Sequence, residues 1–569
     1  MKNITKYLCS ILLTIFVIVI AMVFYAPMFA YQEGMSIFMT GWDFFAETCF
    51  RPGGFSDYLG CLLVQFFMYP IGLTVVLTVC IVGVQLMTKN IFIKHVDKNI
   101  ADIMSVVCAM AMVVTTVNPN TVFGGIVAIL LSIMAVMLFS RINNISIVTA
   151  VVPIVYWISG GWCCLIYIIG ITTNFCRTKK YIFLSISSLL LILTWLLTKK
   201  LTQENSLIDT FVGVIYRRYA TVENWLWYGV IAIVCGNLLL SVIKIELKNR
   251  ITILSLYTIT SFLSIGFMYK TYDKGAMLNY KTDRMVRLKQ WSKIVETIKK
   301  SDYSMMMSQC YLNVALNELG ILENRMFNFA QKGTEGLMSG NIDGFDKSVC
   351  NSEIYFRLGL MNIAERLAID AMESNDTHQK SARHYKRLAE VNIIRHNKPL
   401  AIRYLKKLQR TFFYSAWANR AIDYLNNPEQ TEALADWKIK PLEMEKDIFL
   451  SENYQSEMLL AILLNNPENR KVFNYYMCSL LLSKDLGQMH RFLAKISPAG
   501  ELGIHIYEAT LLYLFNHDRV EFEKLMSNKN EMTMRFDQFG KFMSSSNATN
   551  AAKAKELFGN TYWFYYYFE

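Results

Sequence analysis

The chain has 569 residues, of which 53% are hydrophobic and 18% charged, and its mean hydropathy is +0.28. This composition is too apolar for a purely soluble protein and too polar for one made only of membrane spans. The net charge of +12 does not indicate nucleic-acid binding. Much of the basic excess lies in short loops between apolar segments, and no basic stripe is interleaved with aromatic residues.

Charge is sparse up to about Tyr269 and dense from Lys270 onward. This change predicts a polytopic transmembrane domain at residues 1–269 and a second domain at 270–569. The expected fold class is all-α: a membrane helix bundle of about nine spans, followed by a soluble tetratricopeptide-like α-solenoid.

The first half contains a series of long apolar segments separated by short polar breaks. A helix needs about 20 apolar residues to cross a bilayer, so the two short segments around Ser159-Gly160-Gly161 predict a tight helical hairpin. The first segment resembles a signal peptide without a clean cleavage site, and we expect it to be retained as a span. The segments are Tyr7–Phe24, Leu59–Met87, Ile100–Val117, Val122–Ser140, Ile145–Ser159, Trp162–Phe175, Tyr181–Thr198, Trp225–Ile243 and Ile251–Met268.

The lysine and arginine bias of the short loops predicts the orientation. With the N-terminus inside, the loops Lys89–Lys98, Arg141–Asn144, Arg177–Lys180 and Lys244–Arg250 are all inner and all basic. An odd number of spans then places residues 270–569 outside the cytoplasm. In a bacterium this predicts a multi-pass protein of the inner (cytoplasmic) membrane with a periplasmic C-terminal domain.

The outer side would also carry a loop at 25–58 and a segment at 205–224. Apolar residues in the second segment recur at helical spacing, which predicts a helix lying in the membrane interface.

Residues 270–569 are expected to form amphipathic helices with short breaks. The small-residue spacing after Leu358-Gly359 resembles that of a tetratricopeptide hairpin, and Leu319-Gly320 stands in the same register upstream. The matching residues are Asn362, Ala364, Ala368 and Ala371, with Pro399, Ala401, Leu405 and Leu408 further on. We expect later hairpins at Tyr475–Leu493 and Tyr507–Leu525. Such a solenoid offers a concave surface to a protein or peptide partner.

The chain ends in an aromatic sequence, TYWFYYYFE. It is expected to cap the last helical repeat, and the alternative is an anchor at the membrane interface.

No nucleophile elbow, zinc signature, P-loop or dinucleotide fingerprint is present. The loop at 25–58 is the best place for chemistry. Glu33 directly follows the first span, where low dielectric can keep a carboxylate basic or paired with a cation. Arg51 precedes the turn Pro52-Gly53-Gly54 and is suited to a phosphate. Alternatively, Asp43 and Glu47 form an internal ion-pair cluster with Arg51.

The stretch Tyr31-Gln32-Glu33-Gly34-Met35-Ser36-Ile37-Phe38, just after the first span, resembles the GT-C superfamily of integral membrane glycosyltransferases. Members of that family carry an acidic residue after the first helix, many spans and often an outer C-terminal domain. Gln32 stands where the family often has a second acid. The whole chain also resembles an uncharacterised group of bacterial envelope proteins with a tetratricopeptide-like tail.

The GT-C resemblance implies a glycosyl or glycan transferase that uses a polyprenyl-phosphate-linked sugar donor at the outer leaflet. Glu33 would be catalytic, as a general base or by orienting the acceptor hydroxyl. Arg51, with Arg217 or Arg218, would hold the lipid phosphate. Mg²⁺ or Mn²⁺ would bind Glu33 and Asp43, and the helical repeats would engage the acceptor.

The sequence leaves open whether the protein is an enzyme. The alternative is a non-catalytic, membrane-anchored tetratricopeptide scaffold for an envelope or secretion complex, in which the repeats recruit a partner protein. A transporter is disfavoured, because the spans carry few ionisable residues.

Overall fold

The computed structural model consists of helices and connecting turns, with no β-strand among the residues that it describes. The all-α class is therefore confirmed. The described residues are 2–175, 177–202, 207–214, 224–243, 250–299, 305–340, 344–374, 380–429, 432–441, 455–495, 501–528, 530–545 and 550–569.

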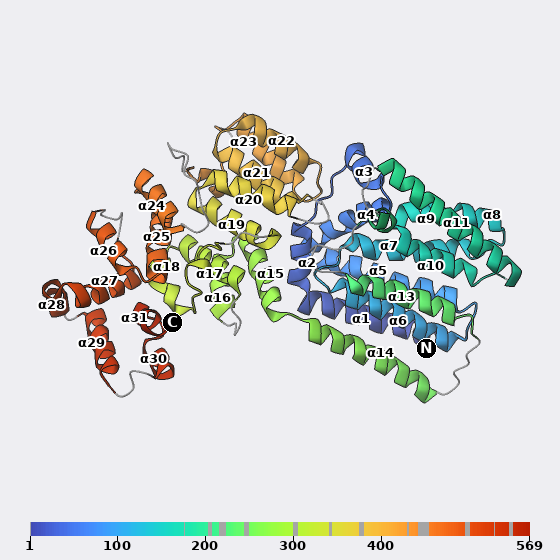
Figure 1. Cartoon of the computed structure of the whole chain (residues 1–569), viewed down its shortest axis with the longest axis horizontal. Helices are drawn as coiled ribbons and strands as arrows, with labels where there is room; N and C mark the ends of the chain where they lie inside the picture. The colour runs from blue at the N-terminus through green and yellow to red at the C-terminus, as the bar shows by residue number, and fades with distance from the viewer. Residues whose placement is uncertain are drawn as a thin grey trace. The chain divides into compact units, whose positions relative to one another are not determined.

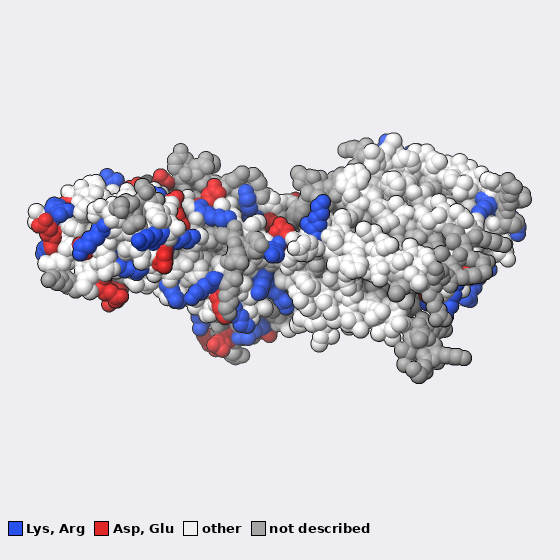
Figure 2. All heavy atoms as spheres, turned by 90° about the horizontal axis from the view of Figure 1, so that it is seen from below, with Lys and Arg blue, Asp and Glu red and all other residues white. Residues whose placement is uncertain are grey.

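The chain divides into two compact units. The first unit comprises residues 1–273, 372–386 and 402–431, and the second comprises 274–371, 387–401 and 432–569. Two segments from the C-terminal half thus belong to the unit that holds the apolar helices. In the face drawn in Figure 2, the surface formed by the apolar helices is mostly white, whereas the surface of the second unit carries many blue and red side chains.

The helices of the first 273 residues are shown in blue to green in Figure 1. They are α1 (Lys2–Val19), the π-helix η1 (Ile20–Phe24), α2 (Ala26–Gly34), α3 (Trp42–Cys49), α4 (Gly54–Val64), the 3₁₀ turn η2 (Gln65–Met68), α5 (Pro70–Phe92), α6 (Lys98–Thr116), α7 (Phe123–Phe139), α8 (Ile145–Ala150), α9 (Val152–Ser159), α10 (Gly161–Thr172), α11 (Arg177–Thr202), α12 (Leu207–Val212), α13 (Trp225–Leu240) and α14 (Arg250–Thr271).

Two segments predicted from apolar composition differ in the structure. The expected span Leu59–Met87 is broken before Pro70, because proline cannot donate the helical hydrogen bond and disfavours a helical residue before it. Tyr69 is accordingly extended, with φ −113° and ψ 133°. The first apolar helix, Leu8–Phe24, bends by 73° into Ala26–Gly34, so the start of the expected loop at 25–58 is itself helical.

By length and composition, three described helices can cross a membrane: Pro70–Phe92, Lys98–Thr116 and Lys179–Leu201. The bent pair of α1–η1 and α2 makes a fourth if it counts as one span. Five further apolar helices have 10–17 residues: Gly54–Met68, Phe123–Phe139, Ile145–Ser159, Gly161–Thr172 and Trp225–Leu240. The structure therefore supports three or four spans, and the expected nine are not confirmed.

Glycine brings the apolar helices into backbone contact. α7 packs against α4, α5 and α10. A Cβ atom added to Gly60 of α4 would lie 2.5 Å from the backbone of Gly124 in α7, and one added to Gly170 of α10 would lie 2.7 Å from Val136 of α7. Small residues at such contacts allow helices to approach closely, which is the usual way for apolar helices to associate in lipid.

From residue 274 onward the helices are shorter. They are α15 (Lys274–Arg287), α16 (Trp291–Lys299), α17 (Met306–Glu318), α18 (Leu322–Arg325), η3 (Met326–Asn328), η4 (Thr334–Gly336), α19 (Phe345–Leu358), α20 (Met361–Glu373), α21 (Ala382–Ile394), α22 (Lys398–Gln409), α23 (Ser415–Asn426), η5 (Ala435–Lys438), α24 (Gln455–Asn465), α25 (Arg470–Leu482), α26 (Leu486–Lys495), α27 (Ile504–His517), α28 (Arg519–Ser527), α29 (Glu531–Met543), α30 (Ala551–Phe558) and α31 (Tyr562–Phe568).

The predicted hairpins are partly present. α19 ends at Leu358, and Gly359 follows with φ +96°, a left-handed conformation that glycine adopts without strain. α20 then packs its alanines inward, and the Ala364 carbonyl accepts a hydrogen bond from Ser352 Oγ at 2.8 Å. The hairpin expected after Leu319-Gly320 is not formed, because its second helix, α18, is a single turn. α25–α26 and α27–α28 occupy the two later predicted hairpins.

The aromatic C-terminus forms α31, which closes the core of the second unit. Trp563 is fully buried and its Nε1 donates to the Glu508 carbonyl at 2.8 Å. The Tyr562 N–H donates to the Glu508 carboxylate at 2.7 Å. The aromatic C-terminus is therefore buried in the core, and its role as the cap of a helical repeat stays a prediction.

The contact between Gly60 and Gly124 can be tested by matched glycine substitutions. Gly60→Ala should destabilise the first unit by about 1–3 kcal/mol, because the added methyl group cannot fit against α7. Gly236→Ala, in α13, is the control, since nothing lies within 4 Å of its added Cβ. Thermal unfolding in detergent measures both, and equal effects of the two substitutions would contradict the close α4–α7 contact.

Candidate functional site

Glu33 lies near the C-terminal end of α2 and is only 1% exposed. Its Oε1 accepts a hydrogen bond from the Tyr414 hydroxyl at 3.1 Å, and the carbonyl of the next residue, Gly34, accepts one from Ser381 Oγ. Both donors come from the late segments of the first unit. The carboxylate that the sequence singles out therefore contacts a residue 381 positions further along the chain.

Asp43 stands in the first turn of α3 and forms a two-point ion pair with Arg410. Arg410 Nη1 donates to Asp43 Oδ2 at 2.7 Å and Nη2 donates to Oδ1. Arg410 Nε also donates to the Thr40 carbonyl at 2.7 Å, and the Thr40 N–H donates to the Arg410 carbonyl at 2.9 Å. The hydrogen bonds from Arg410 lower the pKa of Asp43 to about 2.

Gly41 makes room for this pair. A Cβ at Gly41 would lie 2.3 Å from Arg410 Nη2, and its φ of +129° is unfavourable for any other residue. Aromatic contacts also join residues 38–69 to the segment 402–431. Phe38 stacks on Phe412 at 5.5 Å, and Phe413 contacts the rings of Phe66 and Tyr69 at 5.8 Å and 5.2 Å.

Arg51 pairs within its own neighbourhood. Its Nη2 lies 2.9 Å from Oδ2 of the buried Asp57, and its side chain is 36% exposed. The following turn packs against other elements of the first unit: the Gly53 N–H donates to the Trp157 carbonyl at 2.9 Å. A Cβ on Gly213, just after α12, would lie 2.3 Å from the Pro52 carbonyl oxygen.

The predicted site residues are thus brought together only in part. Glu33 and Asp43 each contact residues of the segment 402–431, through Tyr414 and Arg410 respectively. The alternative ion-pair cluster is wrong in its partners, because Asp43 pairs with Arg410 and Arg51 with Asp57. Arg217 and Arg218, and most of the segment 205–224, lie outside the described residues, although α12 (Leu207–Val212) is described.

The described residues contain no group of three or more His, Cys, Asp or Glu side chains that could hold a metal ion. A Mg²⁺ or Mn²⁺ ion at Glu33 and Asp43 would therefore need its further ligands from groups other than His, Cys, Asp and Glu of the described residues. This metal site stays a prediction.

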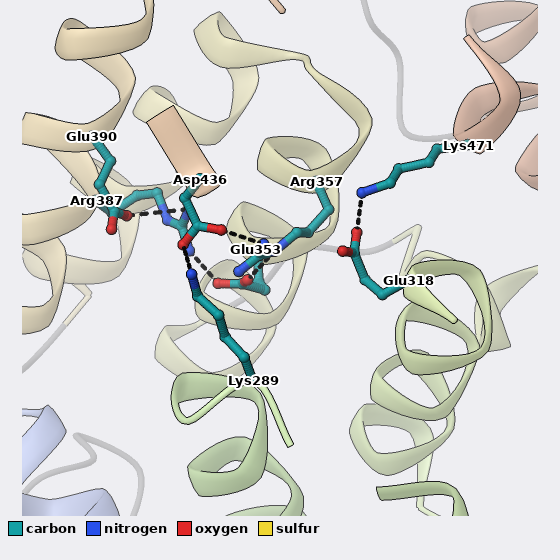
Figure 3. Close-up of polar contacts among 8 residues, drawn as sticks. All are labelled: Lys289, Glu318, Glu353, Arg357, Arg387, Glu390, Asp436 and Lys471. Carbon is teal, nitrogen blue, oxygen red and sulfur yellow. Dashed lines mark hydrogen bonds and ion pairs between the residues drawn. The ribbon is translucent and has the colours of Figure 1, made fainter. Parts of the chain in front are cut away.

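The second unit contains a network of charges, most of them buried, that sequence reasoning missed (Figure 3). Arg357, in the last turn of α19, is its centre. Arg357 Nε donates to Glu353 Oε1 at 2.8 Å and Nη1 donates to Asp436 Oδ1 of η5 at 2.7 Å. Trp291 lies against the guanidinium, with its ring centroid 5.2 Å away.

Two more cations complete the network. Arg387 of α21 pairs with Glu353 and, at 3.4 Å, with Glu390, while Lys289 pairs with Asp436 at 2.5 Å. Three cations (Lys289, Arg357 and Arg387) therefore face three carboxylates (Glu353, Glu390 and Asp436). Burial alone would raise the pKa of Glu353, but Arg387 and Arg357 outweigh it and lower the pKa to about 2. Burial would also raise the pKa of Asp436, but Arg357 and Lys289 outweigh it and lower this pKa to about 2.

A cleft of about 450 Å³ lies beside this network. It is bordered by the end of α19, the segment after η5 and the start of α25. Its side chains are mainly polar, and five of them are cations. The charged lining residues are Arg357, Lys438, Lys440, Glu468, Arg470 and Lys471.

Only part of this arrangement had a signal in the sequence. Glu353 and Arg357 are four residues apart in one helix, the spacing of a helical ion pair. Arg387 and Asp436 lie 34 and 79 residues from their partners, so no local pattern could have assigned them.

The network yields a pH-dependent prediction. Arg357→Met leaves Glu353 and Asp436 without their shared cation and should cost about 3–5 kcal/mol of unfolding free energy at neutral pH. Because both carboxyl pKa values are lowered to about 2, the pairs stabilise the fold fully above about pH 4. That stabilisation disappears as the pH falls toward 2, and the difference between wild type and variant should shrink with it.

Chemical unfolding of the full chain in detergent, at neutral pH and at about pH 3, measures this difference. Arg366→Met is the control, since Arg366 and Asp370 form an exposed pair at 3.8 Å. Its effect should remain below about 0.5 kcal/mol. A deficit of Arg357→Met that stays constant across the pH range would contradict the role given to the network.

Comparison with known families supplies a match to the whole chain. A family model described as "Family of unknown function (DUF6057)" matches residues 1–569. No curated protein and no solved structure matches the chain significantly. The comparisons thus carry no link to membrane glycosyltransferases or to tetratricopeptide repeats. Because the match covers every residue, the chain belongs to the DUF6057 family.

Proposed function

We propose that the protein is a membrane-anchored helical scaffold whose second unit recruits a partner protein. One observation carries this proposal: the acids expected to perform chemistry bind side chains of the late segment 402–431. Asp43 pairs with Arg410, and the buried Glu33 accepts from Tyr414. These contacts lie within the first unit and hold its late segment against α2 and α3, so both acids have a structural role there.

The remaining architecture agrees with such a role. The second unit is built of short helices, some of which pair as hairpins, and repeated hairpins typically present extended surfaces to other proteins. The basic loops between apolar segments favour an inner-membrane protein whose second unit is periplasmic. An arrangement with nine spans would require the shorter apolar helices to cross the bilayer in addition to the three or four long ones.

Co-purification after gentle detergent extraction tests the scaffold. A stoichiometric protein partner is the expected result, and it should be retained when Glu33 is replaced by Gln, provided the variant reaches normal levels. A bound lipid-linked sugar without any protein partner would instead favour an enzyme.

The anchoring role of Asp43 gives a separate prediction. Asp43→Asn removes the charge that holds Arg410, so the amides of residues 402–429 should exchange hydrogen faster in the full chain. Glu47→Gln is the matched control, because Glu47 is an exposed acid one turn further along α3. Hydrogen–deuterium exchange by mass spectrometry measures both variants. Unchanged exchange in Asp43→Asn would show that the pair does not fasten the segment.

A second candidate function is a GT-C-like glycosyl or glycan transferase that uses a polyprenyl-phosphate-linked donor. The observation in its favour is Arg51, whose side chain is 36% exposed and whose buried Nε has no hydrogen-bond partner among the described residues. The turn after it contacts Gly213, which precedes Arg217 and Arg218 by a few residues in the sequence. An arginine in this position could hold a lipid phosphate, while Glu33 acts on the acceptor.

This candidate predicts that Glu33→Gln and Arg51→Ala abolish modification of envelope glycans in a strain lacking the native copy. Arg141→Ala, an exposed arginine in a different loop, is the control. Unchanged glycoprotein and glycolipid profiles, with normal levels of the variants, would exclude the transferase.

A further inference from the structure

A groove of about 300 Å³ runs along three apolar helices of the first unit. It is lined by α6, α13 and α14, and α6 packs against both of the others (Figure 1). The lining extends from Val107 to Thr115 on α6 and from Trp225 to Ile233 on α13. At 1.5 Å per residue, each of these stretches is about 12 Å long. The groove is therefore elongated and follows the helix axes.

A glycine keeps the groove open. Gly229 of α13 belongs to the lining, and nothing lies within 4 Å of a Cβ atom built on it. On α6 the lining includes Ala111, whose side chain is a single methyl group. By contrast, a Cβ atom on Gly60 or Gly170 would meet a neighbouring helix. Those two glycines bring helices together, whereas Gly229 leaves a space that a larger side chain would fill.

The middle of the groove has little to offer a polar ligand. The described residues that line it include no charged side chain. Its three hydroxyls each donate to a carbonyl of their own helix: Thr115 to Ala111 at 3.0 Å, Thr260 to Leu256 at 3.0 Å and Ser264 to Thr260 at 2.9 Å. A group that fills this space must therefore be one that needs no hydrogen bonds, such as a hydrocarbon.

One end of the groove carries an exposed indole. Trp225, the first residue of α13, is 74% exposed. Thr115 Oγ1 also donates to the Leu226 carbonyl at 3.2 Å, which places the end of α6 beside the start of α13. Tryptophan concentrates at the level of the lipid headgroups, where its ring is in hydrocarbon and its N–H is near water. The Trp225 end should therefore face the headgroups, with Ile233 deeper in the bilayer.

The surface beside the groove shows which medium covers it. Ile233 of α13 and the neighbouring Phe262 and Leu263 of α14 are exposed. α6 is one of the helices that can cross a membrane by length and composition. An apolar groove that continues into exposed apolar side chains next to such a helix is covered by the hydrocarbon of the bilayer.

We propose that this groove holds one acyl chain of a membrane phospholipid, with the headgroup at the Trp225 end. A volume of about 300 Å³ lies at the lower end of the range usual for ligand sites, which suits a single chain better than a whole lipid. The chain leaves one hydrocarbon phase for another, so close packing against the helices holds it there. Neither Glu33 nor Arg51 lines the groove, so the lipid site is independent of both functions proposed above.

Photo-crosslinking of the full chain in proteoliposomes tests the site. The probe is a phosphatidylethanolamine with a diazirine in the middle of one acyl chain, diluted into unlabelled phosphatidylethanolamine and phosphatidylglycerol. Mass spectrometry then identifies the labelled residues. Trp225–Ile233 and Thr260–Phe267 should be labelled more heavily per residue than α11, which exposes Leu189, Leu193 and Leu197 and reports ordinary contact with lipid.

Two substitutions fill the groove from different helices, and labelling is measured on the helix opposite each change. Gly229→Leu should reduce labelling of Thr260–Phe267 about fivefold or more, since the loss of about ten carbon contacts is enough for this decrease. Ser264→Leu should reduce labelling of Trp225–Ile233 to a similar extent. It also guards against misfolding of the first variant, because the Ser264 hydroxyl donates within its own helix.

Gly266→Leu is the matched control. Nothing lies within 4 Å of a Cβ atom at Gly266, and this residue of α14 is not part of the lining. Its labelling pattern should equal that of the wild type. Equal losses in Gly266→Leu and Gly229→Leu would overturn the proposal. Equal labelling of α11 and the groove in the wild type would also overturn it, whatever the variants do.

A protein helix is the other possible occupant. Strong labelling of the groove in proteoliposomes, together with its absence in native membranes, would show that another protein fills the groove there. That result would overturn the assignment to a lipid.

Discussion

A guanidinium buried away from water must be paired, and Arg357 meets this requirement through groups that come from separate parts of the chain. Glu353 lies on the same helix, but Asp436 lies 79 residues away. Arg387 also pairs with Glu353, and Lys289 also pairs with Asp436. The arrangement of α19, α21, η5 and the turn after α15 therefore depends on one charge. Lys438 is the last residue of η5, so the same charge also helps to fix where this exposed lysine stands.

The sequence predicted those features that depend on local chemistry. The end of α19 at Leu358-Gly359 follows from the ease with which glycine adopts a positive φ. The burial of the C-terminal helix follows from its many aromatic side chains. The all-helical class and the later hairpins belong to the same group. Each of these predictions needed only neighbours within one or two helical turns.

Features that depend on distant partners were not predictable. The sequence predicts an outer loop at residues 25–58, but α2, α3 and α4 form there, and Phe38 and Asp43 contact Phe412 and Arg410. The apolar run around Tyr69 and Pro70 read as one span because its composition outweighed the proline. In the structure the proline decides: Tyr69 is extended and Pro70 begins a new helix, where its missing N–H costs no helical hydrogen bond.

The contact between Glu33 and Tyr414 also has a consequence for biogenesis. The two residues are 381 positions apart, and at typical rates of translation the hydroxyl emerges on the order of tens of seconds after the carboxylate. During that interval Glu33 and the Gly34 carbonyl must rely on temporary partners such as water or a chaperone. The first unit can therefore finish folding only after residues 372–386 and 402–431 have been synthesised and have packed against it.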